Sequence, residues 1–118
     1  MSDVRNAEME RCIEECGSCH DVCLGALAYC LDRGGIHAEA AHLTMLLDCV
    51  DMCMTTANFL LRDSIAHRQT CDLCADICDL CAESCAGFPD DETMNDCAEA
   101  CISCAAACRD MVRSTAGM

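Results

Sequence analysis

The stretch CDLCADICDLCAESC, residues 71–85, contains five cysteines spaced alternately three and four residues apart. In an α-helix, residues with this spacing lie on one face. The five thiols therefore form one stripe, about 21 Å long at 1.5 Å per residue. The opposite side of the same helix is acidic, with Asp72, Asp76, Asp79 and Glu83. The stretch predicts an amphipathic helix whose buried face consists of sulfur.

Three other segments repeat this cysteine pattern. In total the stripes contain Cys12, Cys16, Cys19, Cys23 and Cys30, then Cys49 and Cys53, then Cys71, Cys74, Cys78, Cys81 and Cys85, and last Cys97, Cys101, Cys104 and Cys108. In the second segment His42 and Met45 continue the stripe toward the N-terminal end. The repeat of about 3.5 residues is that of core positions in packed helices. The four stripes can face one another only by lining the interior of a bundle.

Short polar or glycine-containing breaks separate these segments, at Gly34-Gly35, at residues 62–64 and at residues 87–91, which hold the single proline. The segments between them are rich in Ala, Leu, Met and Glu and poor in β-branched residues. Short connections between helices of similar length favour antiparallel neighbours. We therefore predict an all-α protein, an antiparallel up-down-up-down four-helix bundle with a Cys-lined core. It forms a single domain over 1–118, with helices over 4–32, 37–62, 64–86 and 91–114.

Composition limits the partners and the compartment. The formal net charge of −14 argues against nucleic acid, which needs a basic face, and favours cations. The N-terminal stretch MSDVRNAEMERC resembles no secretion signal, and no run of about 18 apolar residues suggests a membrane span. We expect a cytoplasmic protein without a membrane partner, in a compartment where thiols stay reduced.

The spacing of the cysteines is unfavourable for disulfides within a helix. Cβ atoms at positions i and i+4 lie about 5–6 Å apart, whereas a disulfide needs about 3.5–4.5 Å. Seven CxxxC pairs use 14 of the 16 cysteines, a spacing that suits a metal ion bridging two thiolates. Zinc knuckles and iron–sulfur motifs take compact ligand clusters from loops and turns, not long helical faces. A zinc or other soft-metal store and a cysteine-rich binding module remain alternatives. A thiol redox protein using a CxxC pair such as Cys16/Cys19 is less favoured.

Sixteen cysteines are too many to serve only as small apolar side chains. A bundle with thiols at most core positions has too little side-chain volume for normal packing density, and voids cost stability. Thiolates facing one another would also repel. A row of soft monovalent cations resolves both problems, and thiolates favour Cu(I). Each Cu(I) displaces about one thiol proton, so about one ion per cysteine leaves the core neutral, whereas Zn(II) at that loading would leave it strongly positive.

The sequence resembles a known family, the bacterial cytosolic copper storage proteins. The resemblance covers residues 9–111 and rests on four motifs: CIEECGSCHDVC (12–23), CVDMC (49–53), CDLCADICDLCAESC (71–85) and CAEACISCAAAC (97–108). It implies a four-helix bundle that stores or buffers many Cu(I) ions in its interior, and it implies homotetramers. No catalytic constellation accompanies the cysteines, so we expect a binding function and not an enzyme.

Antiparallel threading assigns the non-cysteine ligands to two ends. One end gathers Cys30, His42, Met45, Cys85, Met94 and Cys97, and the other gathers Met9, Cys12, Leu60, His67, Cys71, Cys108 and Met111. We predict that His42 and Met45 are exchangeable ligands at a mouth that admits Cu(I). Alternatively, Met45 fills the core and His42 is solvated.

The remaining histidines and apolar positions give weaker signals. His67 continues the sulfur stripe at the end closed by Leu60, and we hold it as a candidate ligand. His20 and His37 are expected on the surface, and Met52 in packing. A second apolar stripe on the segment 37–62 is a candidate oligomer contact. It consists of Leu43, Leu47, Val50, Met54, Ala57 and Leu61.

Overall fold

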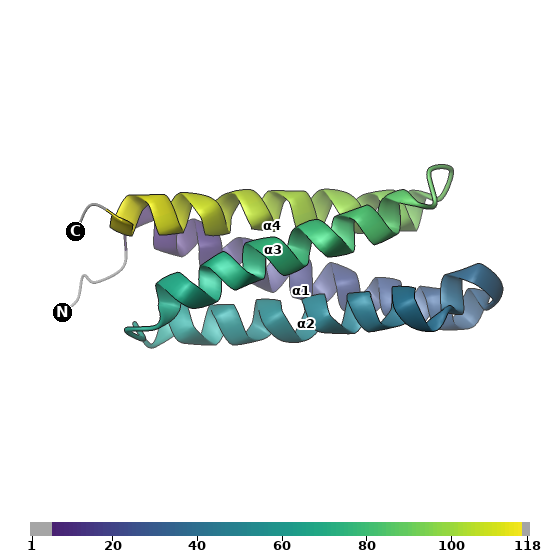
Figure 1. The fold of residues 1–118 in the computed structure, drawn as a ribbon, viewed down its shortest axis with the longest axis horizontal. Coiled ribbons are helices and arrows are strands. Elements are labelled where there is room, and N and C mark those ends of the chain that lie inside the picture. Colours follow the sequence, from purple (N-terminus) through teal and green to yellow (C-terminus); the bar gives the residue numbers. More distant parts are fainter. Residues whose placement is uncertain (1–5, 117–118) are drawn as a thin grey trace.

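A computed structural model describes residues 6–116 as four long helices. These are α1 (Ala7–Arg33), α2 (Ala40–Leu61), α3 (His67–Ala86) and α4 (Glu92–Ala116), with a short 3-10 helix, η1 (Gly35–Ala38), between α1 and α2. Within this range there is no strand. The helices alternate in direction along one long axis (Figure 1). The prediction of an all-α antiparallel bundle is confirmed.

The helices pack in a square, in chain order around the bundle axis. α1 packs against α2 and α4, and α3 packs against the same two helices. Diagonal helices meet through core side chains, as where Cys49 of α2 lies 3.8 Å from Cys101 of α4. The molecule measures 50 × 20 × 19 Å. The α1–α2 and α3–α4 connections share one end, called here the η1 end, on the right of Figure 1. The α2–α3 turn lies at the other end, called the far end, with the start of α1 and the end of α4.

All four helices begin later than the sequence suggested, α4 by one residue and the others by three, because polar residues and turns precede them. The side chain of Asn6 accepts a hydrogen bond from the backbone N–H of Met9 at 2.9 Å, so α1 begins at Ala7 and not at residue 4; residues 4 and 5 lie outside the described range. The segment 35–38 forms η1, so α2 begins at Ala40 and not at 37. Ser64 Oγ accepts from the N–H of Ala66 at 3.1 Å in a turn, and α3 begins at His67 and not at 64.

Two consecutive glycines end α1 with a sharp reversal. Gly34 and Gly35 have φ of +69° and +58°, the left-handed region that favours glycine. The N–H of Gly34 donates to the carbonyl of Cys30 at 3.0 Å. This turn folds η1 back over the open end of the bundle, which places His37 near the axis.

The core consists mostly of sulfur. All sixteen cysteines are fully buried, with alanines and a few larger residues, among them Leu46, Leu60, Met94 and Met111, filling the layers between and beyond them. The acidic residues of α3 opposite its cysteines lie outside, where Asp72 and Asp76 are exposed. The helix faces predicted from the cysteine spacing are therefore those that the bundle buries.

α2 departs from one expectation about the sequence. Within residues 6–116 it is the one helix long and apolar enough to cross a membrane by length and composition, although we expected no such segment. The core helix of a bundle meets the same criterion. Two faces explain its apolar character: Cys49 and Cys53 lie in the core, whereas Leu47, Met54 and Leu61 are exposed on another side.

Candidate metal centre

The sixteen thiols are free and lie in close contact along the bundle axis. The shortest Sγ–Sγ distances join neighbouring helices, 3.4 Å between Cys23 and Cys97 and 3.6 Å between Cys12 and Cys108. Within helices, a CxxxC pair such as Cys19/Cys23 is separated by 3.9 Å. A metal ion about 2.3 Å from each sulfur can bridge sulfurs up to about 4.6 Å apart. The contacts therefore suit bridging metal ions and are too long for S–S bonds.

Fourteen cysteines form five groups in which all sulfur atoms lie within 4.8 Å of one another. From the far end, the groups are Cys12/Cys71/Cys108, Cys16/Cys74/Cys104/Cys108, Cys19/Cys53/Cys78/Cys104, Cys19/Cys23/Cys49/Cys101 and Cys23/Cys81/Cys97/Cys101. Each group shares at least one cysteine with the next. The shared thiols make one continuous column of ligands, called here the thiol column.

A mixed ligand set lies where the thiol column meets the η1 end. Cys30 Sγ lies 3.5 Å from His42 Nε2 and 3.7 Å from Met94 Sδ. Cys85 is the other cysteine outside the five groups, and its neighbours Cys81 and Cys97 raise the pKa of its thiol. The predicted position of His42 beside the cysteines is thus the one observed.

Met45 does not occupy the place that its sulfur suggested. The fully buried position on α2 after His42 is taken by Leu46, and Met45 is only partly buried against the core. The buried thioether at this end comes from Met94 on α4. The helical spacing from His42 to Cys49 allowed either Met45 or Leu46 at the buried position. We predicted Met45 because its thioether can bind a metal ion.

An aromatic side chain covers the mixed ligand set. The Phe88 ring lies between two imidazoles, with centroids 4.4 Å from His37 and 4.9 Å from His42. His42 Nδ1 lies 2.6 Å from Ser84 Oγ, which holds the ring with Nε2 toward Cys30. The Phe88 ring therefore lies against His42 at the η1 end.

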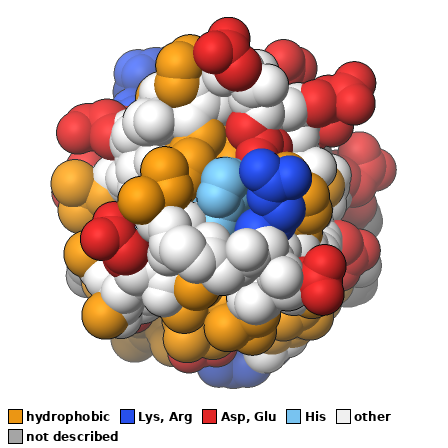
Figure 2. Space-filling model, turned by 90° about the vertical axis from the view of Figure 1, so that its right-hand side faces the viewer, with side chains coloured by type: hydrophobic (Ala, Val, Ile, Leu, Met, Phe, Trp, Pro, Cys, Tyr) orange, Lys and Arg blue, Asp and Glu red, His pale blue; other side chains and the backbone are white. Residues whose placement is uncertain are grey.

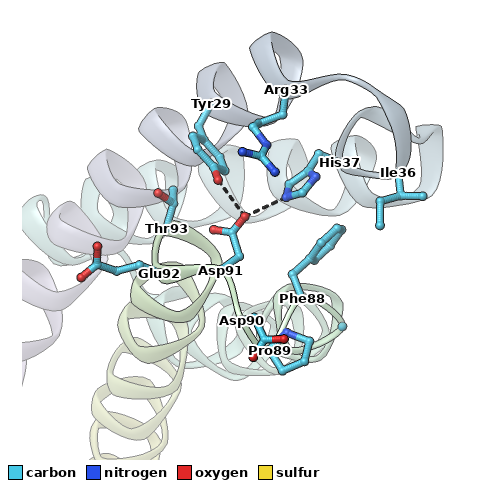
Figure 3. Close-up of a pocket in the computed structure, with 11 residues that line it drawn as sticks. Tyr29, Arg33, Ile36, His37, Phe88, Pro89, Asp90, Asp91, Glu92 and Thr93 are labelled. Carbon is cyan, nitrogen blue, oxygen red and sulfur yellow. Dashed lines mark hydrogen bonds and ion pairs between the residues drawn. The ribbon is translucent and has the colours of Figure 1, made fainter.

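Asp91 fixes the loop that carries Phe88. Its Oδ2 accepts a hydrogen bond from the Tyr29 hydroxyl at 2.7 Å and lies 2.8 Å from His37 Nε2 (Figure 3). Its Oδ1 accepts from the N–H of Met94 at 3.0 Å. The expectation that His37 lies on the surface is wrong: it is 8% exposed, because η1 folds it against Asp91. Asp91 thereby joins α1, η1 and α4.

An open pocket of about 560 Å³ lies over this loop and is lined by Tyr29, Arg33, His37, Phe88 and Asp91 among others. Figure 2 looks onto the η1 end and shows a histidine beside a basic side chain near its centre, with acidic side chains around the rim. Solvent thus reaches the residues that cover the mixed ligand set.

The far end carries soft side chains of its own. Met9 and Met111 are buried, together with Leu60, next to the Cys12/Cys71/Cys108 group. His67 is partly buried; its Nδ1 lies 2.8 Å from the carbonyl oxygen of Ser64, and its Nε2 is buried without a hydrogen-bond partner.

Of the residues outside both ends, Met52 packs as expected, whereas His20, expected on the surface, is partly buried with its side chain 18% exposed. His20 is paired with exposed Asp21 at 3.0 Å, and Met52 packs against the core.

The model of the family described as copper storage protein matches residues 5–113. The chain belongs to the copper storage protein family. No curated protein sequence matches it significantly. The residues matched by the family model span all four helices and hence the whole thiol column.

Solved structures of this family and of similar chains share the fold. A Cu(I)-bound copper storage protein of Bacillus subtilis is 32% identical, with 89% of this chain and 98% of that one covered and a TM-score of 0.84. A cytosolic copper storage protein from Streptomyces lividans, solved with five coppers, is 33% identical, with 90% and 92% covered and a TM-score of 0.84. A protein from Nitrosospira multiformis is 37% identical, with 91% and 96% covered and a TM-score of 0.84.

The electrostatics of the thiol column fit a copper storage protein that is loaded by exchange of protons for metal. A hydrogen bond between Cys19 and Cys101 lowers the pKa of Cys19 to about 6, whereas one between Cys16 and Cys104 raises the pKa of Cys16. Some thiols therefore ionise readily because their neighbours keep their protons. Each further thiolate needs a cation beside it, since like charges repel in a buried site.

At the η1 end the mixed ligand set is neutral before metal binds. Burial raises the pKa of the Cys30 thiol, with Asp91 and Cys97 adding to the effect. Burial lowers the pKa of His42, so its imidazole is unprotonated at neutral pH, the form that binds metal.

Proposed function

We propose that this chain stores Cu(I), binding about one ion per cysteine through the thiolates of the column, and that the role is binding without catalysis. The observation that carries the proposal is the sharing of cysteines between neighbouring groups. Shared thiolates can bridge adjacent Cu(I) ions, so a row of ions fills the whole interior. Storage of this kind does not need a single reactive CxxC pair, as a thiol redox enzyme would.

Zinc fits the same geometry less well. Four of the five groups contain four cysteines, as a tetrahedral zinc site does. Because neighbouring groups share cysteines, the zinc ions could not each take four thiolates of their own. Zinc would therefore leave much of the column empty or carry excess positive charge into a buried site.

Anaerobic titration of the reduced protein tests the proposal. Cu(I) is delivered from a chromophoric chelator, and thiolate binding is followed by ultraviolet charge-transfer absorption. We expect uptake close to one Cu(I) per thiol with unchanged helix content, and saturation by Zn(II) near one ion per four thiols. Saturation by Cu(I) at only one or two ions per chain would overturn the storage role.

We propose further that Cu(I) enters through the mixed ligand set of Cys30, His42 and Met94. These side chains are soft, neutral and adjacent to Cys97, so an ion can pass from them to the thiol column. We expect a His42→Ala, Met94→Leu variant to load more slowly in stopped-flow measurements. Met45→Leu is the matched control, because Met45 carries a thioether at the same end without full burial. Equal rates for the double variant and the control would remove this role.

Two further proposals concern the oligomeric state and the cellular compartment of the protein. The predicted second apolar stripe divides: Val50 and Ala57 are buried within the chain, whereas Leu47 and Leu61 are 44% and 53% exposed. We propose that the exposed part contacts other copies in a homotetramer, and that the protein acts in the cytoplasm like its Streptomyces relative. A Leu47→Glu, Leu61→Glu variant should be smaller by light scattering than the parent chain; an unchanged mass would contradict this contact.

A further inference from the structure

The far end carries three soft side chains one helical turn beyond its last cysteines. Met9 precedes Cys12 by three residues, His67 precedes Cys71 by four, and Met111 follows Cys108 by three. These spacings place each side chain on the same helix face as its cysteine. Those three cysteines form the terminal group of the thiol column. Three of the four helices thus extend the column with a further soft side chain, and only α2 ends it with an aliphatic one, Leu60.

His67 is held in the tautomer that binds metal. Its Nδ1 lies 2.8 Å from the carbonyl oxygen of Ser64, which can only accept, so Nδ1 carries the hydrogen and Nε2 presents a lone pair. Histidines that bind metals commonly donate their other N–H to a backbone carbonyl in this way. Nε2 is also the only buried side-chain nitrogen or oxygen in the described residues without a hydrogen-bond partner. A buried polar atom without a partner is unusual and calls for an explanation.

Two buried methionines lie at the same end of the bundle as this nitrogen. Met9 is 3% exposed and Met111 is fully buried, so their thioethers belong to the interior and not to the surface. Thioethers are soft ligands that select Cu(I). An ion pair between Arg11 and Asp110, 2.8 Å apart, joins α1 to α4 and fixes the two helices relative to each other. Arg11 is close to Met9 in sequence, and Asp110 is next to Met111.

We propose a terminal Cu(I) site at the far end, formed by His67 Nε2 with the thioethers of Met9 and Met111 and bordering the Cys12/Cys71/Cys108 group. The inference rests on the proposed storage function. All three ligands are neutral, so binding here adds one positive charge and releases no proton. The site is therefore weaker than the thiolate sites and fills after them, and it gives the thiol column an exchange point at each end.

The test uses the full chain with ¹⁵N-labelled histidine, loaded stepwise with Cu(I) without oxygen. We expect the Nε2 resonance of His67 to shift only in the last equivalents, after Cu(I)–thiolate absorption has levelled off. His20, paired with Asp21 outside the core, is the internal control and should not shift. A His67 Nε2 resonance that stays unchanged at saturation would overturn the site.

A matched pair of variants gives a second measurement. His67→Gln should bind one Cu(I) fewer per chain than the parent protein with the same final Cu(I)–thiolate absorption, and His20→Gln should bind the parental number. Equal copper content in all three proteins would overturn the site while leaving storage intact. Failure of storage itself is distinguishable, since Cu(I)–thiolate absorption would then not develop in any of them.

Discussion

The two ends of the bundle offer similar ligands under different covers. Each has one histidine and at least one buried methionine next to cysteine, His42 with Met94 at the η1 end and His67 with Met9 and Met111 at the far end. At the η1 end a single aromatic ring on a loop separates the ligands from an open pocket. At the far end the side chains of Leu60, Met9 and Met111 are packed into the core itself. We infer that the cover, more than the ligand type, determines which end exchanges copper faster.

The largest effect should be that of copper on the stability of the two ends. A ligand present at 100 times its Kd stabilises the folded state by about 2.7 kcal/mol per site, and this protein has many sites. We expect loaded protein to remain folded well above the melting temperature of the metal-free form. During stepwise loading, hydrogen exchange should slow first in residues 26–33, near the η1 end, and later in residues 9–16.

Protection of residues 9–16 before residues 26–33 would reverse the comparison between the ends. A suitable control is the same titration with Zn(II), which should protect less of the column because shared thiolates cannot serve four-coordinate ions independently.

Removing the aromatic cover should be the next largest effect. Phe88→Ala deletes ring contacts with two imidazoles, and aromatic pairs are worth about 0.5–1.5 kcal/mol each. If opening of the loop breaks both contacts and limits uptake, the loading rate should rise by at least about fivefold, since about 1.4 kcal/mol corresponds to a factor of ten. Stopped-flow absorption at the Cu(I)–thiolate band measures this rate.

The matched control is Phe59→Ala. Phe59 is a partly buried phenylalanine on α2 close to the far end, where its ring lies 4.7 Å from the Arg62 guanidinium carbon. We expect the parental loading rate for this variant. Faster loading in Phe59→Ala than in Phe88→Ala would mean that copper enters mainly at the far end.

Much of this arrangement could be predicted from the sequence, because the cysteine spacing fixes the buried face of every helix. The same spacing and the short connections also predicted which residues gather at each end. The errors arose where local pattern does not decide. His37 is buried by Asp91, 54 residues away in sequence, and no helix periodicity shows such a contact. On α2 the buried positions run His42, Leu46, Cys49, Cys53, and a stripe through Met45 fits the helical period equally well.

A smaller effect concerns the acid sensitivity of the loop at the η1 end. The hydrogen bond from Tyr29 and those from Met94 and His37 lower the pKa of Asp91 to about 2. A carboxyl whose folded pKa is depressed stabilises the fold above its unfolded pKa, about 3.9, and this contribution is lost as the pH falls toward 2. We therefore expect the α3–α4 loop to open between about pH 4 and pH 2, seen as lower hydrogen-exchange protection factors, that is, rates relative to an unfolded chain at the same pH, at residues 88–94.

Asp91→Asn keeps an N-cap for α4 but removes the titrating group, so the protection factors of this loop should no longer change with pH in that window. Asp110→Asn makes the corresponding change at the far end, where Arg11 lowers the pKa of Asp110. Loss of the pH dependence at residues 88–94 in Asp110→Asn instead would contradict the role of Asp91.

The smallest effect should come from the ion pair at the far end. Arg11 and Asp110 lie 2.8 Å apart with side chains 48% and 38% exposed, and exposed pairs contribute about 0.2–1 kcal/mol. Arg11→Ala should lower the free energy of unfolding of the metal-free protein by that amount in urea. The loss should shrink at high salt, because screening weakens exposed pairs. Asp110 retains Arg113 as a second partner in the variant, which keeps the loss small.

Because the far end is sealed by buried side chains and not by this ion pair, copper exchange at that end should stay as slow in Arg11→Ala as in the parent protein. A faster rate would show that the ion pair holds that end closed.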